Sequence, residues 1–405
     1  MRGRAIISHR RSVTIALIVP ARTPAPVVGL SSNVLEGPEF AARPDGIGIY
    51  TRELEAALCA EGVLVRRIGA PMRRGARLVR PRHADIAFPL PLPYLTAASS
   101  ALGIHVPFAQ RIERVIDVYH ATDYLAPRLA RTPVVTTLHD AIPLAYPHWA
   151  NPRLRKLKNW LLRECAQAAD AVIAISHAAV AELTEHFRIP VERIRVVPLG
   201  VHARWFEAPD ESRVRDTLVR HRLQRGYILH VGTLQPRKNL DALVSAYESL
   251  PATVRAERQL VLVGKYGWSA QALVARLARH RQDGRVMWID YVTQDELRAL
   301  YCGAGMFAYP SLAEGFGLPL VEALATGLPV IASDLPVLRE IAMHHAHFVS
   351  PHRVDDIAGA IERQHMQVDA QAADLRREHA RSFTWQACAR RTLDVYYEVS
   401  RGAVR

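Results

Sequence analysis

Two glutamates and the glycines between them make up the stretch of the chain best suited to chemistry. It runs from Tyr309 through Glu314-Gly-Phe-Gly-Leu-Pro-Leu-Val-Glu322. The pattern predicts a strand that ends at Tyr309, a glycine-containing loop, and a helix with Pro319 in its first turn. The glycines let a ligand approach the backbone, and the helix start offers N–H groups to an anion. Glu314 and Glu322 can therefore accept hydrogen bonds from vicinal hydroxyls, as on a sugar or a ribose.

Cations suited to a diphosphate come earlier, in the segment YILHVGTLQPRKN. This segment predicts a strand, a turn at Gly232 and Thr233, and a helix with Asn239 as its N-cap. Arg237 and Lys238 precede that helix, where they and its N-terminus can hold a diphosphate together. Taken alone, such a pair reads as a solvated loop cap. Beside the glutamate segment, and in a chain with four lysines, a functional reading is favoured.

The elements that would position these groups alternate between apolar strands and helices, which predicts α/β domains with doubly wound parallel sheets. In the first half the predicted strands are 13–19, 63–68, 115–120, 134–138 and 171–175, and the predicted helices are 50–60, 151–168 and 177–186. In the second half the predicted strands are 227–231, 260–263, 286–289, 306–309 and 330–332, and the predicted helices are 239–250, 270–281, 296–301, 318–325, 354–364 and 384–400. Two such units in succession predict a ligand crevice between them, beyond the carboxyl ends of the strands.

Two segments break this alternation. Residues 70–112 are rich in Pro and Arg and are expected to form an irregular, partly exposed insertion. Residues 200–226 contain Pro209 and a polar run, and we expect the hinge between the two units there.

Composition fits a globular protein of two domains, since the chain has 405 residues with 49% apolar and 22% charged side chains. Residues 10–20 imitate a signal peptide, but the apolar part is short and no small-x-small site follows, so a first strand is the better reading. Four scattered cysteines are typical of a reduced cytoplasmic protein.

Residues 1–205 hold 27 Lys and Arg against 16 Asp and Glu, which suggests an anionic partner. Because 48 of the 52 basic residues are Arg, a GC-rich genome explains the excess equally well.

The two site segments together resemble the nucleotide-sugar-binding half of glycosyltransferase family 4, retaining enzymes of the GT-B architecture. Its Glu-x7-Glu hallmark is matched by Glu314 and Glu322, and VGTLQPRKNLDALVSAY resembles its phosphate-binding strand, loop and helix. The segments DGIGIYTREL, VVTTLHDAIPLAYPHW, ADAVIAISHAAVAEL, IRVVPLGV and FTWQACARRTLDVY also resemble family members. The resemblance implies an N-terminal acceptor-binding Rossmann-like domain (1–205), a C-terminal nucleotide-sugar-binding Rossmann-like domain (206–383) and a terminal helix that crosses back (384–405).

The resemblance also implies roles for individual residues. Glu322 would bind the ribose hydroxyls, and Glu314 would hold hydroxyls of the donor sugar. The residues expected at the rest of the donor site are Gly46, Gly48, Gly232, Thr233, Phe316 and Gly317. Arg237 and Lys238 would neutralise the departing diphosphate. His139 would face the donor sugar across the cleft, although on its own it reads as an ordinary loop histidine.

The expected reaction uses no metal and no cofactor. No Asp-x-Asp occurs in the sequence, so fixed cations and helix N-termini would stabilise the leaving group instead. The resemblance implies that the acceptor attacks on the face that the nucleotide leaves, with the phosphate oxygen taking the proton and no protein nucleophile. Two departures stand out: Thr233 replaces a common Arg, and Asp290-Tyr291 replaces a Gly-aromatic pair in the base-binding region.

The motifs resemble most closely those of bacterial mannosyltransferases of surface polysaccharide synthesis, so GDP-mannose is the leading donor and a UDP- or dTDP-sugar the alternative. The expected acceptor is a glycan on polyprenyl diphosphate. The basic first half and the helix with Lys156, Lys158 and Trp160 would suit a cytoplasmic protein docked on the anionic inner face of the cell membrane, unless that helix is an ordinary surface helix. A GT-B epimerase is the second candidate, and nucleic-acid binding, for which no motif is present, is the third.

Overall fold

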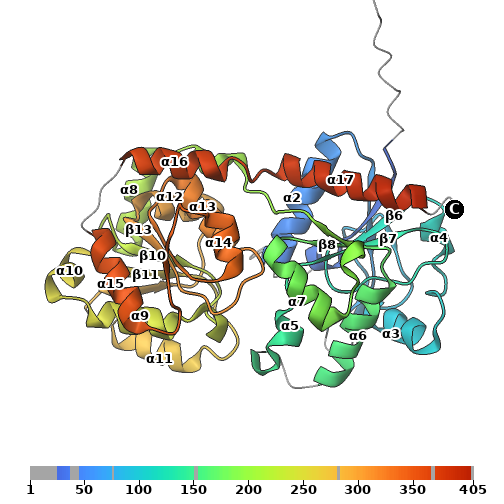
Figure 1. Cartoon of the computed structure of the whole chain (residues 1–405), viewed down its shortest axis with the longest axis horizontal. Coiled ribbons are helices and arrows are strands. Elements are labelled where there is room, and N and C mark those ends of the chain that lie inside the picture. Colours follow the sequence, from blue (N-terminus) through green and yellow to red (C-terminus); the bar gives the residue numbers. More distant parts are fainter. Residues whose placement is uncertain are drawn as a thin grey trace, which may run out of the picture.

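The computed structural model describes residues 25–36, 45–74, 77–149, 154–280, 283–365 and 370–402. It contains two parallel sheets, each with helices packed around it, and α16 and α17 run along the top of both (Figure 1). The predicted α/β class with two doubly wound units is confirmed. The predicted strand at 13–19 lies outside the described residues.

The first sheet has seven strands in the order β5-β2-β1-β6-β7-β8-β9. Their bounds are β1 (Val28–Ser31), β2 (Val65–Gly69), β5 (Ile86–Ala87), β6 (Val118–Ala121), β7 (Val134–Leu138), β8 (Ala171–Ala174) and β9 (Ile194–Val196). Every pair is parallel, and β7 and β8 are buried along their whole length. β8 is an unbroken apolar run, whereas β7 also buries Thr136 and Thr137. β1 was not predicted, because Gly29 and Ser31 interrupt its short apolar run and Ser32 follows it, yet β1 is fully buried between β2 and β6.

The second sheet has six parallel strands in the order β12-β11-β10-β13-β14-β15. Their bounds are β10 (Ile228–Val231), β11 (Leu260–Val263), β12 (Val286–Ile289), β13 (Met306–Tyr309), β14 (Val330–Ser333) and β15 (His347–Val349). Because β10 pairs directly with β13, the two loops that carry the candidate site residues leave the same sheet edge side by side. The first five strands were predicted within one residue at each end, whereas β15 was missed.

The helices of the first unit are α2 (Gly46–Ala60), α3 (Leu92–Leu102), α4 (Gln110–Glu113), α5 (Ile142–Ala145), α6 (Arg155–Ala168) and α7 (His177–Phe187). Those that follow are α8 (Glu211–His221), α9 (Leu240–Ser249), α10 (Ala252–Glu257), α11 (Gln271–Arg279), α12 (Gln294–Gly303), α13 (Leu318–Thr326), α14 (Pro336–Ala342), α15 (Val354–His365), α16 (Ala370–Ala380) and α17 (Trp385–Gly402).

The expectation of an irregular insertion over residues 70–112 was wrong in part. A hairpin forms from β3 (Met72–Arg74) and β4 (Arg77–Val79), β5 joins the edge of the main sheet, and α3 is a regular helix. The buried side chains of α3 (Leu92, Leu95, Thr96 and Ser99) have helical spacing, but the surrounding prolines and arginines obscured it.

The segment 200–226, predicted to be the hinge, contains a helix that packs on the second unit. α8 buries Val214, Thr217 and Leu218 on one face and lies against α12. Trp205 packs edge-on against Tyr301 of α12, with 5.0 Å between ring centres. The polar residues that suggested a linker form the solvent face of α8.

The last helix returns the chain to the first sheet. α17 packs against α2, β6 and β8. Its Tyr396 is fully buried, and the Tyr396 hydroxyl lies 2.6 Å from His120 Nδ1 on β6. Cys59, Cys165, Cys302 and Cys388 are free thiols. Among the described residues, none of the helices combines the length and the apolar character needed to span a membrane.

Candidate donor site

The loop after β10 carries the two predicted cations into the space beside β13. A short 3-10 turn over Pro236–Lys238 ends at Asn239, which has the left-handed φ of 56° that asparagine tolerates. The Asn239 side chain does not cap α9, which corrects the prediction. Its Nδ2 donates instead to the carbonyls of Pro310 at 3.0 Å and Pro351 at 2.6 Å. These bonds tie the β10 loop to the loop that carries Glu314.

Glu314 lies between the two cations and is almost completely buried. Lys238 Nζ donates to Glu314 Oε1 at 2.5 Å, and Arg237 Nη1 donates to Oε2 at 2.9 Å. The side chains of Glu314 and Lys238 are each 6% exposed. Burial opposes the charge of Glu314, but the two cations outweigh it and hold its pKa at about 2. Three charged groups thus form one cluster with a net charge of +1 at neutral pH.

Lys238 has a second partner that the sequence did not reveal. Its Nζ donates to the Tyr309 hydroxyl at 2.6 Å and lies 4.6 Å from the centre of that ring. Burial lowers the pKa of Lys238 to about 8, although Glu314 favours the charged form. Beneath Tyr309, the His230 ring stacks at 5.8 Å and is itself buried. A tyrosine at the last position of a strand was the available signal, because that position faces the strand-end crevice.

The glycines after Glu314 serve two different needs. Gly317 has φ 98° and begins α13, a conformation that favours glycine. A Cβ on Gly315 would lie 2.0 Å from the carbonyl oxygen of His139, so only glycine allows this approach between the two units. Phe316 between them is buried against Phe383, and so anchors the loop.

Glu322 occupies a different place, in a cavity of about 290 Å³ between the units. Of the predicted site residues, Gly46, Gly232, Thr233 and Glu322 line this cavity. The Tyr301 hydroxyl donates to Glu322 Oε2 at 3.1 Å. Burial raises the pKa of Glu322 to about 8, so the carboxyl group is largely protonated at neutral pH. Lys265, Asp290 and Tyr291 line the same cavity.

The cavity and the charged cluster adjoin each other at Gly232. A side chain there would meet Lys238 Cε at 3.3 Å, so the lysine stem passes directly behind the turn that lines the cavity. From the first unit, α2 begins at the same cavity, where Asp45 Oδ1 accepts a hydrogen bond from Gly48 N at 2.8 Å. Carboxylate, cation and two glycine turns therefore converge on one crevice at the carboxyl ends of both sheets.

His139 lies at the boundary between the units, but its ring turns toward its own domain. Its Nε2 donates to the Thr122 carbonyl at 2.9 Å, and Tyr50 packs edge-on at 4.9 Å. Burial lowers the pKa of His139, so the ring is neutral. The backbone of His139, rather than its imidazole, makes the close approach to Gly315.

Known proteins match both halves of the chain. Residues 44–205 match the family model described as Glycosyltransferase Family 4, and residues 219–369 match the one described as Glycosyl transferases group 1. Over 288 residues the chain is 32% identical to O-antigen chain mannosyltransferase B of Escherichia coli, covering 69% of this chain and 74% of that protein.

The chain belongs to glycosyltransferase family 4.

Further relatives agree with this assignment. Serotype-specific mannosyltransferase WbdA of Escherichia coli is 30% identical over 264 residues, which are 62% of this chain and 32% of that longer protein. The solved sucrose-phosphate synthase of Thermosynechococcus elongatus superposes with a TM-score of 0.71 at 20% identity, covering 93% of this chain and 99% of that one. The GT-B fold implied by the resemblance is therefore confirmed.

In this family 4 glycosyltransferase a clamp that the sequence did not suggest joins the two units. Glu340 on α14 accepts hydrogen bonds from the first two amides of α7, His177 N at 2.8 Å and Ala178 N at 2.7 Å. The helix N-terminus favours the negative charge. Ser176 Oγ donates to the Gly315 carbonyl at 3.2 Å beside it. These bonds connect the two units of the glycosyltransferase beside the crevice.

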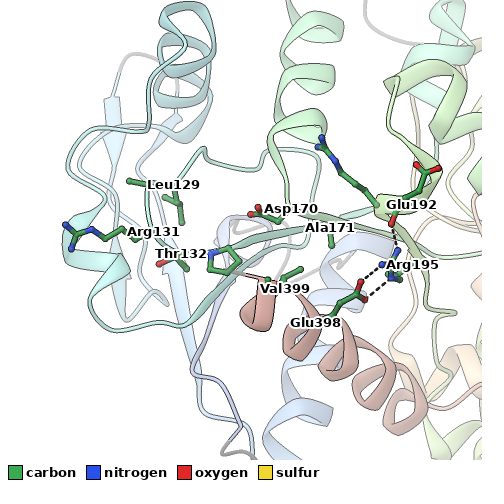
Figure 2. Close-up of a pocket in the computed structure, with 13 residues that line it drawn as sticks. Leu129, Arg131, Thr132, Asp170, Ala171, Glu192, Arg195, Glu398 and Val399 are labelled. Carbon is green, nitrogen blue, oxygen red and sulfur yellow. Dashed lines mark hydrogen bonds and ion pairs between the residues drawn. The ribbon is translucent and has the colours of Figure 1, made fainter. Parts of the chain in front are cut away.

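A larger cavity of about 540 Å³ lies at the opposite edge of the first sheet of the glycosyltransferase, at the amino ends of β7, β8 and β9 (Figure 2). Arg195, one of the arginines that line this cavity, forms an ion pair with Glu398 of α17, with 2.9 Å between Arg195 Nε and Glu398 Oε2. Arg195 also donates a hydrogen bond to the Glu192 carbonyl. The pair fastens the end of α17. Ligands of such folds bind at the carboxyl ends of strands, so the smaller cavity is the donor-site candidate.

Proposed function

We propose that this glycosyltransferase moves a mannosyl group from GDP-mannose to a glycan acceptor carried on polyprenyl diphosphate, in O-antigen or related polysaccharide synthesis. The observation that carries the proposal is the buried cluster of Glu314, Lys238 and Arg237 directly behind the cavity that holds Glu322. The names of the Escherichia coli relatives support the sugar and the pathway class.

In the proposed donor complex, the nucleotide occupies the cavity with its ribose hydroxyls on Glu322. The diphosphate lies against the turns at Gly232 and at the start of α2, where the net positive cluster attracts it. Arg237 and Lys238 are positioned for the charge that develops as the bond to the sugar breaks. Once the donor is bound, both cations would already lie where this charge develops.

Glu314 acts in this proposal by orienting and by charge, and not as a nucleophile. Its two oxygens already accept strong hydrogen bonds from cations, and a pKa of about 2 makes it a weak base. The acceptor hydroxyl would attack on the face that the diphosphate leaves, and the departing phosphate oxygen would take its proton. The clamp between Glu340 and α7 would keep water out during this step.

The experiment that tests the donor site measures thermal stabilisation by GDP-mannose, UDP-glucose and a dTDP-hexose. A ligand that binds only the folded form raises its apparent stability. We expect GDP-mannose to stabilise the protein and Glu322→Gln to reduce the effect, while Glu362→Gln, on the exposed face of α15, retains it. Stabilisation by a UDP- or dTDP-sugar alone would overturn the mannose assignment. A folded protein that responds to none of them would overturn the donor site.

We also propose that the first unit docks on an anionic membrane through α6 and α3. The start of α6 holds four basic and no acidic residues over 155–163, and Leu154 and Leu157 are exposed there. α3 packs beside α6, carries no charge, and exposes Tyr94 and Leu102. Exposed apolar side chains next to a basic helix suit an anionic lipid surface.

Cosedimentation with lipid vesicles tests this docking. We expect binding to phosphatidylglycerol vesicles and little binding to phosphatidylcholine vesicles, with a decrease in Leu157→Glu but not in Leu375→Glu, an exposed leucine on α16. Equal binding to both lipids, or equal loss in both variants, would contradict the proposal. Metal independence and the cytoplasmic location are part of the same proposal and stay predictions.

A further inference from the structure

Two carboxylates of the first unit, Asp140 and Glu182, lie next to the candidate site, and the charge of Asp140 also acts on Arg237 and Lys238. Asp140 follows β7 and sits at the boundary, where its Cβ would be 3.1 Å from a Cβ placed on Gly315. Tyr124 Oη donates to Asp140 at 2.9 Å and Ile142 N at 3.0 Å, both to Oδ1. Within the described part of the chain, no donor reaches Oδ2. Asp140 therefore presents an oxygen beside the residue that follows Glu314.

Glu182 continues this acidic surface along α7. The helix begins at the boundary with the second unit, and Glu182 lies on it half-buried. α7 begins beside Gly315, where Ser176 Oγ donates to the Gly315 carbonyl, and α5, which follows Asp140, packs against α7. Burial and the charge of Asp140 both raise the pKa of Glu182. No side chain or amide among the described residues donates a hydrogen bond to Glu182. Glu182 therefore keeps its carboxylate oxygens accessible for a hydroxyl group of a ligand.

Three aromatic rings extend the surface outward from Glu182. Burial and the charge of Glu182 raise the pKa of Tyr146, at the end of α5, which packs against α7. The Tyr146 ring stacks on Trp149 with 4.5 Å between centres, and His148 lies 4.9 Å from Trp149. These side chains are only partly buried or exposed. From the boundary between the two units outward, the surface thus presents Asp140 first, then Glu182, then the three rings.

The chemistry of this surface favours a neutral polyhydroxylated ligand. Two carboxylates repel phosphates, so a nucleotide or a diphosphate would not bind here. Hydroxyl groups donate well to carboxylates, and aromatic rings pack against the apolar face of a sugar ring. The surface also ends close along the chain to the basic start of α6, where the proposed membrane contact would hold a lipid carrier.

We propose that Asp140, Glu182 and the rings of Tyr146, His148 and Trp149 form the acceptor subsite, where the carboxylates accept hydroxyls of the terminal sugars of a glycan and the rings pack against them. This assignment rests on the proposed function and deepens it. It makes Asp140 and Glu182 groups that bind and orient the acceptor next to the donor sugar, and it assigns the donor no contact with Glu182.

The test compares Glu182→Gln and Trp149→Leu with Glu185→Gln, which removes an exposed carboxylate one turn further along α7. Acceptor binding is measured by saturation-transfer NMR, with p-nitrophenyl glycosides of mannose, glucose, galactose and N-acetylglucosamine as probes. The best probe then serves in a transfer assay. We expect Glu182→Gln to raise the acceptor KM about 10-fold to 100-fold, the range for a lost hydrogen bond to a charged group. Trp149→Leu should act in the same direction and Glu185→Gln should change nothing.

Thermal stability and the donor KM separate this proposal from failure of the fold or of the donor site. Both should stay at wild-type values in Glu182→Gln. The proposal is overturned by an unchanged acceptor KM, by an equal effect of Glu185→Gln, by a parallel loss of donor affinity, or by a wild-type protein that binds no glycoside. If the proposed function fails, no nucleotide sugar will stabilise the wild-type protein. The NMR experiment is run without donor, so it still tests whether the acceptor subsite binds a glycoside.

Discussion

The charge of Glu314 holds two buried cations in place, so its removal should destabilise the second unit. In Glu314→Gln the side chain keeps its size, but Lys238 and Arg237 lose their common counter-charge. A pKa of about 2 in place of 4.5 corresponds to about 3 kcal/mol of the free energy of unfolding, at roughly 1.4 kcal/mol per pH unit. Breaking a buried ion pair by removing one partner costs about 3–5 kcal/mol in other proteins, which agrees.

The pH dependence of the same variant follows from the sign of the pKa change. A carboxyl group whose pKa is lowered on folding stabilises the protein fully above its unfolded value of 4.5, and loses that contribution as the pH falls through about 2. The wild-type protein should therefore be about 3 kcal/mol more stable than Glu314→Gln at pH 7. The difference should shrink steadily between pH 4.5 and pH 2.

A double variant distinguishes this explanation from a simple packing defect. Burial of the Lys238 ammonium is itself unfavourable, since its pKa falls to about 8 from 10.5. Removing that charge as well, in Glu314→Gln/Lys238→Met, should restore most of the lost stability because Arg237 then remains as a single, partly exposed cation. Lys238→Met alone should cost less than Glu314→Gln, because Glu314 keeps Arg237 as a partner.

The free energy of unfolding is measured by urea unfolding. Amide hydrogen exchange of β10 and β13 is measured as a second assay, because it reports on the second unit directly. Glu362→Gln, on the exposed face of α15, is the matched control and should leave the exchange unchanged. The reasoning is refuted if Glu314→Gln is as stable as the wild-type protein at pH 7. It is equally refuted if the double variant is less stable than either single variant.

Three further predictions concern neighbouring groups. Glu340→Gln removes the charge that engages the first amides of α7, so small-angle scattering of the ligand-free protein should show a larger radius of gyration; an unchanged radius would mean that the clamp does not set the closed form. The donor affinity, measured by calorimetric titration, should rise from pH 6 to about pH 8 as Glu322 ionises and should fall above pH 8 as Lys238 loses its charge. The rise should be absent in Glu322→Gln; if it persists there, a group other than Glu322 causes it. Tyr309→Phe removes a buried acceptor of Lys238 and should lower the free energy of unfolding by about 1–3 kcal/mol in urea, and no loss would show that another group replaces the hydroxyl.

The parts of the fold that the sequence predicted well are those whose burial leaves a local pattern. β11, β12 and β13 are unbroken apolar runs, and β7 contains only threonines besides its apolar residues; each of the four was placed at its observed bounds. β1 was missed because its glycine and serine are buried by the strands on either side, which is a property of the sheet and not of the segment. α8 was mistaken for a hinge because its buried face consists of only Val214, Thr217 and Leu218 in a mainly polar segment.

The candidate site likewise has features that the sequence predicted and features that it did not. Glu314, Arg237 and Lys238 were predicted because their residue types and their positions after strands are visible in the sequence. Their mutual pairing was not predicted, because it depends on the register of β10 against β13, where Ile228 lies opposite Met306. The partners Tyr301, Tyr309 and Glu340 likewise come from distant elements, and no spacing in the chain connects them to the residues that they contact.

The pairing of Glu314 with both cations bears on how the proposed reaction begins. Without donor, Lys238 and Arg237 are both committed to Glu314, so a diphosphate must compete with this carboxylate for them. Such competition would free the oxygens of Glu314 when, and only when, the donor arrives, and a sugar hydroxyl could then replace a cation as their partner. Glu314, Lys238 and Arg237 carry a net charge of +1, which attracts an anion, while the charge of Asp140 acts on the same two cations and opposes part of this attraction. The same three residues would thereby couple recognition of the diphosphate to recognition of the sugar. The intact donor would then bind with a more favourable free energy than the sum of the binding free energies of an isolated sugar and an isolated diphosphate.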